Sequence, residues 1–304
     1  MLVTVLMSTY NGEKYLREQL DSILHQKGVD VRLIVRDDCS KDHTLSILHE
    51  YANKFPNISI ESGDINLRPC KSFFKLICNN TDCDYFALSD QDDIWDEDKL
   101  ISAVHMLEKV DQMKPAMYFS NLRIVDQNNK FYRNSHSQRR DLNNKYRSLT
   151  ECAASGCTIV YNRKLAEIAA RVKPCDFSMH DTWIYMTCAF FGNVVYDYQP
   201  HINYRQHGNN VIGTQLKKNT ISRMLMIIKR MFNRNLQPRY DNAVEFLREF
   251  GTELEQNDLA KVLEIVSYKR TRKTRKKLLS DIDILPAGRL KKFQIRMLVR
   301  LGIV

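Results

Sequence analysis

Hydrophobic positions in the first two hundred residues alternate between short apolar runs and helical spacing. The run over 2–8 is typical of a buried strand, and the apolar residues over 16–24 recur at the spacing of one helix face. The alternation continues with strands expected at 32–36, 58–60, 85–88, 157–161 and 194–196, and with helices expected at 45–52, 73–77, 165–172 and 182–191. This order predicts an α/β fold in which helices flank a mostly parallel central sheet.

Polar segments follow three of the expected strands where the chain would leave the sheet. Residues 8–11 (STYN) follow the first strand, residues 37–38 (DD) the second, and residues 90–93 (DQDD) the fourth. In open α/β sheets, ligands bind beyond the carboxyl ends of the strands. We therefore expect these segments to line one site, where Asp38 could accept a base N–H or a ribose hydroxyl. The alternative for 37–44 is a capped strand-to-helix turn.

Three carboxylates fall within four positions, at Asp90, Asp92 and Asp93, and Trp95 follows them. Like charges at this spacing repel one another unless a cation lies among them, and carboxylate oxygens suit Mg²⁺ or Mn²⁺. The alternative is a solvated acidic turn at the start of a helix near 96–99. The cluster is thus a candidate metal site.

The net charge of +10 is concentrated in the last hundred residues. Residues 205–304 hold 22 lysines and arginines against 9 acidic residues. Apolar and basic residues segregate onto opposite helical faces over 221–234, a basic run covers 269–277, and a less regular amphipathic segment covers 290–301. This region fits either an anionic membrane surface or packing on the rest of the chain with its basic face solvated.

Two regions are expected, a catalytic domain over 1–213 and a basic helical region over 214–304, because no strand pattern follows Gly213. The polar segment 127–150 predicts a mobile loop that orders over a ligand. The helical region could also supply a dimer contact, which leaves the oligomeric state open.

No apolar stretch reaches the roughly 18 residues that a membrane span requires, and the first residues lack a cationic lead and a cleavage site. These features predict a cytoplasmic protein. The eight cysteines form no C-x-x-C pair, which favours reduced thiols over disulfides or zinc ligands.

Together, the polar segments resemble the nucleotide-sugar half of a family 2 glycosyltransferase with the GT-A fold. The resemblance covers residues 1 to about 213 and is closest to bacterial rhamnosyltransferase-like members. The family's D-x-D motif falls on Asp90 and Asp92, with Asp92 as the direct metal ligand and Asp93 beside the donor sugar. Gln91 stands where many relatives have a small residue. The resemblance also implies a nucleotide site formed by Thr9, Tyr10, Asn11 and Asp38.

Three later segments resemble further parts of that family's site. Residues 154–158 (ASGCT) resemble a small-residue turn beside the donor, where Gly156 permits close backbone approach; a plain turn is the alternative. Residues 180–183 (HDTW) resemble the acidic catalytic stretch, which makes Asp181 the candidate general base or, alternatively, only a helix N-cap. Residues 205–210 resemble the R-x-H-G-x-N stretch of rhamnosyltransferase-like members. The resemblance puts Arg205 at the diphosphate, His207 at the metal or diphosphate, and Trp95, His180 and Trp183 on the acceptor side.

The implied activity is inverting, metal-dependent transfer of a sugar, with rhamnose as a candidate, from a UDP- or dTDP-linked donor. The acceptor would be a hydroxyl of a bacterial surface polysaccharide or a lipid-linked glycan. A carboxylate must take the proton of that hydroxyl, and Mg²⁺ or Mn²⁺ must offset the charge of the leaving diphosphate. Such an enzyme would work peripherally at the inner face of the cytoplasmic membrane.

Two other functions stay open on the sequence. A nucleotidyltransferase of similar architecture usually carries a glycine-rich basic loop after its first strand, and residues 8–12 are no such loop. The basic tail could instead bind nucleic acid. However, the run over 269–277 lacks interleaved aromatic residues and the N-terminal pocket is acidic, so no nucleic-acid partner is expected.

Overall fold

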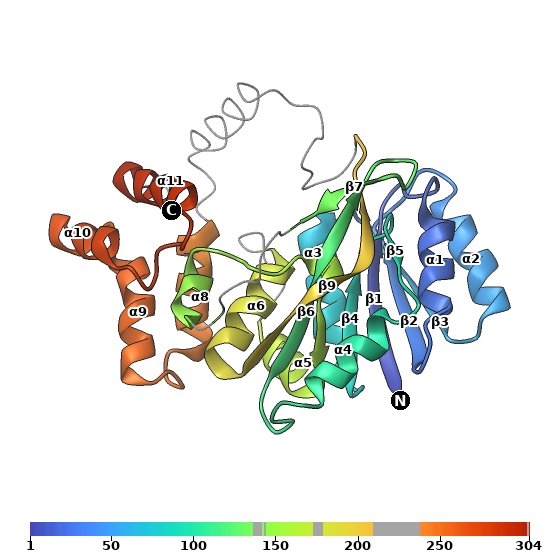
Figure 1. The fold of residues 1–304 in the computed structure, drawn as a ribbon, viewed down its shortest axis with the longest axis horizontal. Helices are drawn as coiled ribbons and strands as arrows, with labels where there is room; N and C mark the ends of the chain where they lie inside the picture. The colour runs from blue at the N-terminus through green and yellow to red at the C-terminus, as the bar shows by residue number, and fades with distance from the viewer. Residues whose placement is uncertain (136–141, 143, 173–178, 209–237, 303) are drawn as a thin grey trace.

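A central sheet organises the protein, which we describe from a computed structural model covering residues 1–135, 142, 144–172, 179–208, 238–302 and 304 (Figure 1). Nine strands form this sheet in the order β3-β2-β1-β4-β8-β6-β9-β5, and β7 pairs with β6. The strands are β1 (Leu2–Thr9), β2 (Asp30–Asp37), β3 (Ile58–Ser62), β4 (Tyr85–Ser89), β5 (Ile94–Trp95), β6 (Ala116–Val125), β7 (Phe131–Asn134), β8 (Val160–Asn162) and β9 (Asn193–Arg205).

The sheet is parallel in its first half and mixed in its second. Strands β3, β2, β1 and β4 run parallel to one another. Strand β8 is antiparallel to both β4 and β6, whereas β6 and β9 are parallel. The α/β class with a helix-flanked sheet is confirmed. The parallel half brings the polar ends of β1, β2 and β4 to one edge.

Helices cover both faces of the sheet and create two hydrophobic cores. Helices α1, α2 and α4 bury their apolar sides in one core, and α3, α5 and α6 in the other. Side chains of β1 alternate between the two, with Val5 in the first core and Leu6 in the second, as the pleat of a strand requires. The helices are α1 (Leu16–Leu24), α2 (Thr44–Lys54), α3 (Arg68–Asn79), α4 (Lys99–Leu107), α5 (Arg163–Ala169) and α6 (His180–Phe191).

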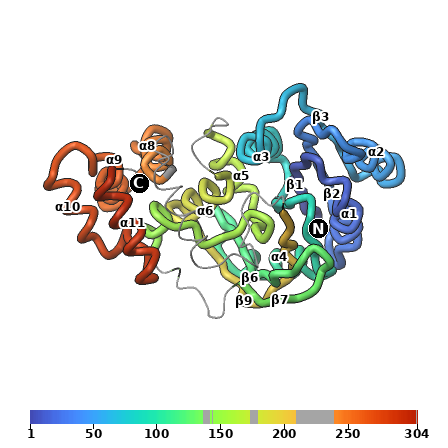
Figure 2. Tube along the Cα trace, turned by 90° about the horizontal axis from the view of Figure 1, so that it is seen from above, coloured from blue at the N-terminus to red at the C-terminus, as the bar shows by residue number. Residues whose placement is uncertain are grey.

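Four further helices extend the core that lies beyond α6, at one end of the molecule in both Figure 1 and Figure 2. Phe246 of α8 packs against Trp183 of α6, with ring centroids 5.9 Å apart, and Phe250 lies 6.0 Å from the same ring. The described part of 214–304 therefore shares a core with the sheet. The four are α8 (Pro238–Phe250), α9 (Gln256–Ser267), α10 (Arg272–Ser280) and α11 (Arg289–Leu301).

Some sequence expectations differ from the structure, and one falls outside the described residues. Strand β6 was not expected at all, and β9 runs to Arg205 rather than ending at 196. The segment 127–150 holds β7 and a 3₁₀ helix (Lys145–Leu149), so its described part is not one open loop. The amphipathic segment 221–234 lies outside the described residues. Across the described residues, no helix is both long enough and apolar enough to cross a membrane.

Candidate active site

A cavity of about 1430 Å³ opens beyond the carboxyl ends of β1, β2 and β4. Residues from the N-terminal turns, the acidic cluster, the 152–157 segment and the start of α6 all line it. Sequence positions nearly two hundred residues apart are thereby brought together. The predicted residues that line it are Thr9, Tyr10, Asn11, Asp38, Asp90, Asp92, Gly156, His180, Asp181 and His207.

The turn after β1 is fixed to the turn after β2 by hydrogen bonds. The Thr9 hydroxyl donates to Asp37 Oδ1 at 2.9 Å, and the Asn11 N–H donates to Ser40 Oγ at 2.9 Å. Asn11 adopts a left-handed φ of 48°, which asparagine tolerates better than most residues. Tyr10, 46% exposed, lies at the tip of this turn and is presented to the cavity.

Asp38 lines the cavity, but its carboxylate is already heavily engaged. It pairs with buried Arg36 at 2.5 Å and accepts the N–H groups of Leu67 and Arg68, each at 2.8 Å. These bonds hold the start of α3, where Arg68 has a φ of 65°. Asp38 thus shapes this part of the cavity by fixing the loop that carries Arg68.

Gln91 connects the acidic cluster to the first turn. Its side-chain oxygen accepts the Tyr10 N–H at 2.8 Å, and its amide donates to the Tyr10 carbonyl at 3.0 Å. A Cβ at Gly12 would lie 2.3 Å from that same oxygen. The glutamine between Asp90 and Asp92 therefore has a structural role, which is to hold the turn that carries Tyr10.

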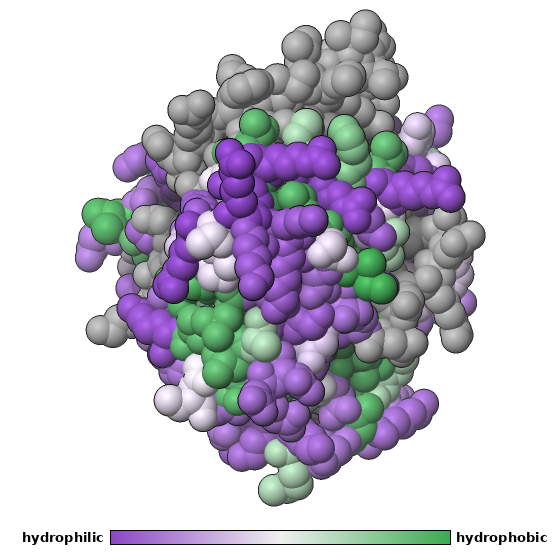
Figure 3. Space-filling view, turned by 90° about the vertical axis from the view of Figure 1, so that its left-hand side faces the viewer, coloured by the Kyte–Doolittle hydropathy of each residue, from purple (hydrophilic) through white to green (hydrophobic). Residues whose placement is uncertain are grey.

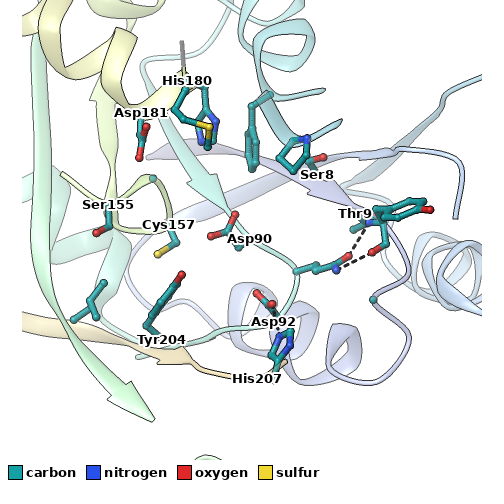
Figure 4. Close-up of a pocket in the computed structure, with 18 of the residues that line it drawn as sticks. Ser8, Thr9, Asp90, Asp92, Ser155, Cys157, His180, Asp181, Tyr204 and His207 are labelled. Atoms are coloured by element: carbon teal, nitrogen blue, oxygen red, sulfur yellow. Dashed lines mark hydrogen bonds and ion pairs between the residues drawn. The ribbon is translucent and has the colours of Figure 1, made fainter. Parts of the chain in front are cut away.

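The carboxylates of the cluster occupy different environments. Asp92 Oδ2 lies 2.7 Å from His207 Nε2, and Figure 4 shows Asp90 between this pair and Asp181. Burial, followed by the charges of Asp92 and Asp181, raises the pKa of Asp90 to about 7. Asp93 is fully buried, and burial raises its pKa well above the ordinary value. Asp93 does not line the cavity, so direct contact with a donor sugar is not supported.

The carboxylate set suits a hard divalent cation. One oxygen each of Asp90 and Asp93 and the Cys157 sulfur lie within 4.8 Å of one another, and Asp93 Oδ2 is buried without a hydrogen-bond partner among the described residues. Two of these three atoms are carboxylate oxygens, and burial raises the pKa of the third, the Cys157 thiol. Oxygen ligands therefore dominate, which fits Mg²⁺ or Mn²⁺.

Arg205 does not line the cavity but forms hydrogen bonds to the acidic turn. Its backbone N–H donates to Asp93 Oδ1 at 3.0 Å, its Nε to the Asp92 carbonyl at 3.0 Å, and Nη2 to Glu18 at 2.7 Å. The residue as a whole is 2% exposed. The predicted diphosphate contact is not supported by this placement, which makes Arg205 a positioning residue.

His180 and Asp181 begin α6 at the wall of the cavity. The helix starts at His180, with Met179 as its N-cap, so Asp181 lies in the first turn and is not the N-cap. His180 stacks on Phe73 at 4.0 Å, and burial lowers its pKa, which keeps the imidazole neutral. A Cβ at Gly156 would lie 2.9 Å from His180 Nε2, so the glycine permits this close approach.

Neither tryptophan reaches the cavity. Trp95 is 3% exposed, and the Nζ of buried Lys99 lies 3.3 Å from its ring centroid. Burial also lowers the pKa of Lys99 to about 7. Trp183 is fully buried among the aromatic residues of α8. We therefore do not retain either tryptophan as an acceptor contact.

Several cavity residues had no recognisable motif in the sequence. Tyr204 precedes the R-x-H-G stretch and could have been included with it, whereas isolated basic residues carried no signal. Lys291 is the most distant, because α11 brings it to the wall from the C-terminal region, where it pairs with Glu151. The lining residues missed by the sequence include Lys14, Asn66, Arg68, Arg133, Tyr204 and Lys291.

Comparison with known proteins decides the family. Residues 4–168 match the profile described as Glycosyl transferase family 2, which is more than half of the chain. The chain belongs to this glycosyltransferase family. The matched region of the glycosyltransferase contains the Thr9, Asp38, Asp90 and Asp92 positions, and Asp181 lies beyond its end. Family membership favours glycosyl transfer over nucleotidyl transfer.

Relatives support the same assignment. The glycosyltransferase is 31% identical over 261 residues to the dTDP-rhamnosyl transferase RfbG of Shigella flexneri, covering 78% of this chain and 84% of that protein. It is 30% identical over 126 residues to an uncharacterised glycosyltransferase of Rickettsia prowazekii, covering 41% of this chain and 38% of the relative.

Solved structures share the fold at low sequence identity. Staphylococcus aureus TarS 1–349 in complex with UDP-GlcNAc has a TM-score of 0.57 and 16% identity, covering 99% of this chain and 92% of that one. The mannosyltransferase PcManGT of Pyrobaculum calidifontis, in complex with GDP-Man and Mn²⁺, has a TM-score of 0.52 and 14% identity, covering 99% and 86%. These likenesses confirm the GT-A type of fold.

Proposed function

We propose that this glycosyltransferase performs inverting, metal-dependent transfer with Asp181 as its general base. The observation that carries the proposal is the meeting of Asp181, Asp90 and the Asp92–His207 pair on one cavity. The charge of Asp181 lies close enough to contribute to the raised pKa of Asp90. In this proposal, the proton acceptor and the cation would face the same cavity.

The chemistry assigns separate roles to the two ends of this group. A sugar hydroxyl is a weak nucleophile and must lose its proton as it attacks the anomeric carbon, which Asp181 would accept. Asp90, Asp92 and His207 would hold Mg²⁺ or Mn²⁺, whose charge would offset that of the departing nucleoside diphosphate. Attack opposite the leaving group inverts the anomeric configuration.

The donor and acceptor follow from similarity. The likeness to a dTDP-rhamnosyl transferase supports a dTDP-linked donor with rhamnose as the sugar, and UDP-linked sugars are the alternative. The acceptor would be a hydroxyl of a bacterial surface polysaccharide or lipid-linked glycan, as the family resemblance implies. We place the enzyme in the cytoplasm, at the inner face of the cytoplasmic membrane.

Replacing Asp92 or Asp181 with Asn tests the proposal. Each variant should lower transfer at least about 100-fold, because each removes a charge that acts on the reacting groups. D92N should also lose the thermal stabilisation given by Mn²⁺ with dTDP, whereas D181N should keep it. Transfer from dTDP-rhamnose and UDP-sugars, together with melting temperature, provides the measurement. Near-normal turnover in both variants would contradict the mechanism.

A further inference from the structure

Helix α11 carries an apolar stripe that faces solvent. Leu290 is 81% exposed, Phe293 63% and Leu301 53%, and Met297 between them is partly exposed. The spacing of three, four and four residues places these side chains on one side of the helix. The other side is used for packing, since Ile295 and Val299 are 3% and 0% exposed. Helix α11 is therefore apolar on two opposite faces, and one of them is exposed in the part of the chain that the structure describes.

Basic residues surround the exposed stripe. At 100° per residue, Arg289, Arg296 and Arg300 fall along one flank of it, and Lys291 falls on the other. Figure 3 views this end of the molecule and shows apolar side chains beside long hydrophilic ones. The neighbouring helix adds the exposed cations Arg272, Lys273 and Lys276.

We propose that α11 lies in the interface of an anionic phospholipid membrane, with Leu290 and Phe293 inserted among the lipids. A stripe of apolar side chains flanked by cations fits a surface that is apolar beneath and negatively charged above. A second copy of this chain fits less well, because it carries the same charge of +10. The lipid surface is thus the occupant with complementary charge.

The same helix contributes one residue, Lys291, to the wall of the cavity. Lys291 lines the cavity and pairs with Glu151, while its neighbour Leu290 points into solvent. An α11 seated on the membrane would hold this wall of the cavity beside the lipid headgroups. This step rests on the proposed function: a lipid-linked acceptor would enter from the side where Lys291 lies.

A tryptophan placed on the stripe reports insertion directly. In F293W, the emission should shift to the blue when phosphatidylglycerol vesicles are added, and lipids brominated on their chains should quench it. The native Trp95 and Trp183 are buried and give a constant background. M113W is the matched control, because Met113 is 78% exposed outside α11 and should show no shift.

Vesicle pelleting measures the contribution of the stripe. L290S/F293S should bind phosphatidylglycerol vesicles about tenfold more weakly than the unchanged protein. I65S/M113S, which alters two exposed apolar residues elsewhere, should bind normally. Binding should fall with added salt and be weak on pure phosphatidylcholine.

The outcomes separate this inference from the proposed function. Normal vesicle binding by L290S/F293S, or a blue shift of F293W that depends on protein concentration without vesicles, would overturn the membrane assignment, and the second would favour self-association. Thermal stabilisation by dTDP with Mn²⁺ should persist in every variant. If dTDP with Mn²⁺ does not raise the melting temperature of the unchanged protein, that result counts instead against the proposed glycosyltransferase mechanism.

Discussion

Gly12 and Gln91 are in close contact at the wall of the cavity. A methyl group at Gly12 would meet the Gln91 side-chain oxygen at 2.3 Å, and that oxygen holds the Tyr10 N–H. Because a glutamine side chain can swing away, the substitution is expected to cost the hydrogen bonds to Tyr10 and leave the fold intact. The two positions therefore act as one unit.

The coupling gives a prediction about nucleotide binding. G12A and Q91A should each weaken dTDP binding by about tenfold, because each frees the Tyr10 turn, an effect of roughly 1.4 kcal/mol. The double variant should be no weaker than either single variant, since the same bonds are lost. Calorimetric titration of dTDP with Mn²⁺ measures all three. Additive losses would show that the two residues act separately.

The raised pKa of Asp90 predicts that binding of the proposed cation depends on pH. Its pKa of about 7 in the folded protein exceeds the ordinary value near 4, so between these pH values the folded state binds the extra proton. The contribution of Asp90 to folding stability therefore falls as pH rises from about 4 to 7. Above pH 7 the ionised carboxylate is ready for a cation.

Mn²⁺ should accordingly raise the melting temperature more at pH 8 than at pH 6, because below pH 7 the metal must displace a proton. D90N should show a smaller shift with little difference between the two pH values. Thermal unfolding with and without Mn²⁺ at both pH values measures this. An equal shift of the unchanged protein at both would contradict the role of Asp90.

At the level of single residues, the sequence predicts the cavity residues that belong to short contiguous motifs. The D-x-D carboxylates and His207 belong to recognisable motifs and do line the cavity. Arg205 belongs to a motif as well, yet its side chain turns toward Glu18 and the main chain. Lys291 could not be found, because only the packing of α11 brings it to the wall.

At the level of elements, strand β6 shows why an alternating pattern can be missed. It lies between β8 and β9 and is buried on both faces, so its ten residues do not alternate. Ser120 and Asn121 interrupt its apolar run but are buried, and their side chains bond to the backbone of the strand itself. The Asn121 side chain also accepts the Ser135 hydroxyl, so buried polar residues with partners inside the fold can hide a central strand.

Strand β9 was underestimated for a related reason. Most of its thirteen residues are partly exposed, including charged and polar side chains, and Pro200 interrupts the regular pairing with β6. Its register shifts between Ser120 and Arg123 of the partner strand. The extended part nevertheless delivers Tyr204 and Arg205 to the acidic turn. From the sequence alone, a strand with this composition resembles a loop, because the strand that pairs with it is not known.

At the level of the whole molecule, the core continues from the sheet into the C-terminal helices. Phe246 is fully buried against Trp183 of α6 and against Phe190, with ring centroids 4.9 Å apart for the second pair. The described parts of the two sequence regions, 1–213 and 214–304, therefore share an apolar core, and ion pairs such as Lys145–Asp258 and Lys291–Glu151 also connect them. The boundary near Gly213 was expected because no strand pattern follows it, and the division into two domains stays a prediction.

F246A should therefore destabilise the entire protein by about 3–5 kcal/mol, because the lost ring leaves a cavity between α6 and α8. V244A on the same helix changes a residue that is 37% exposed and should cost less than about 0.5 kcal/mol. Urea unfolding followed by far-UV circular dichroism compares the two. An unchanged midpoint for F246A would show that the helices fold independently of the sheet.

The placement of Trp95 and Trp183 has a spectroscopic consequence. The chain contains two tryptophans, and each is embedded in a different one of the two cores, on opposite faces of the sheet. The tryptophan fluorescence of the native protein is consequently the sum of two signals, one from each hydrophobic core. Substituting either ring by phenylalanine leaves a single optical reporter, which reveals whether both layers melt in one cooperative event.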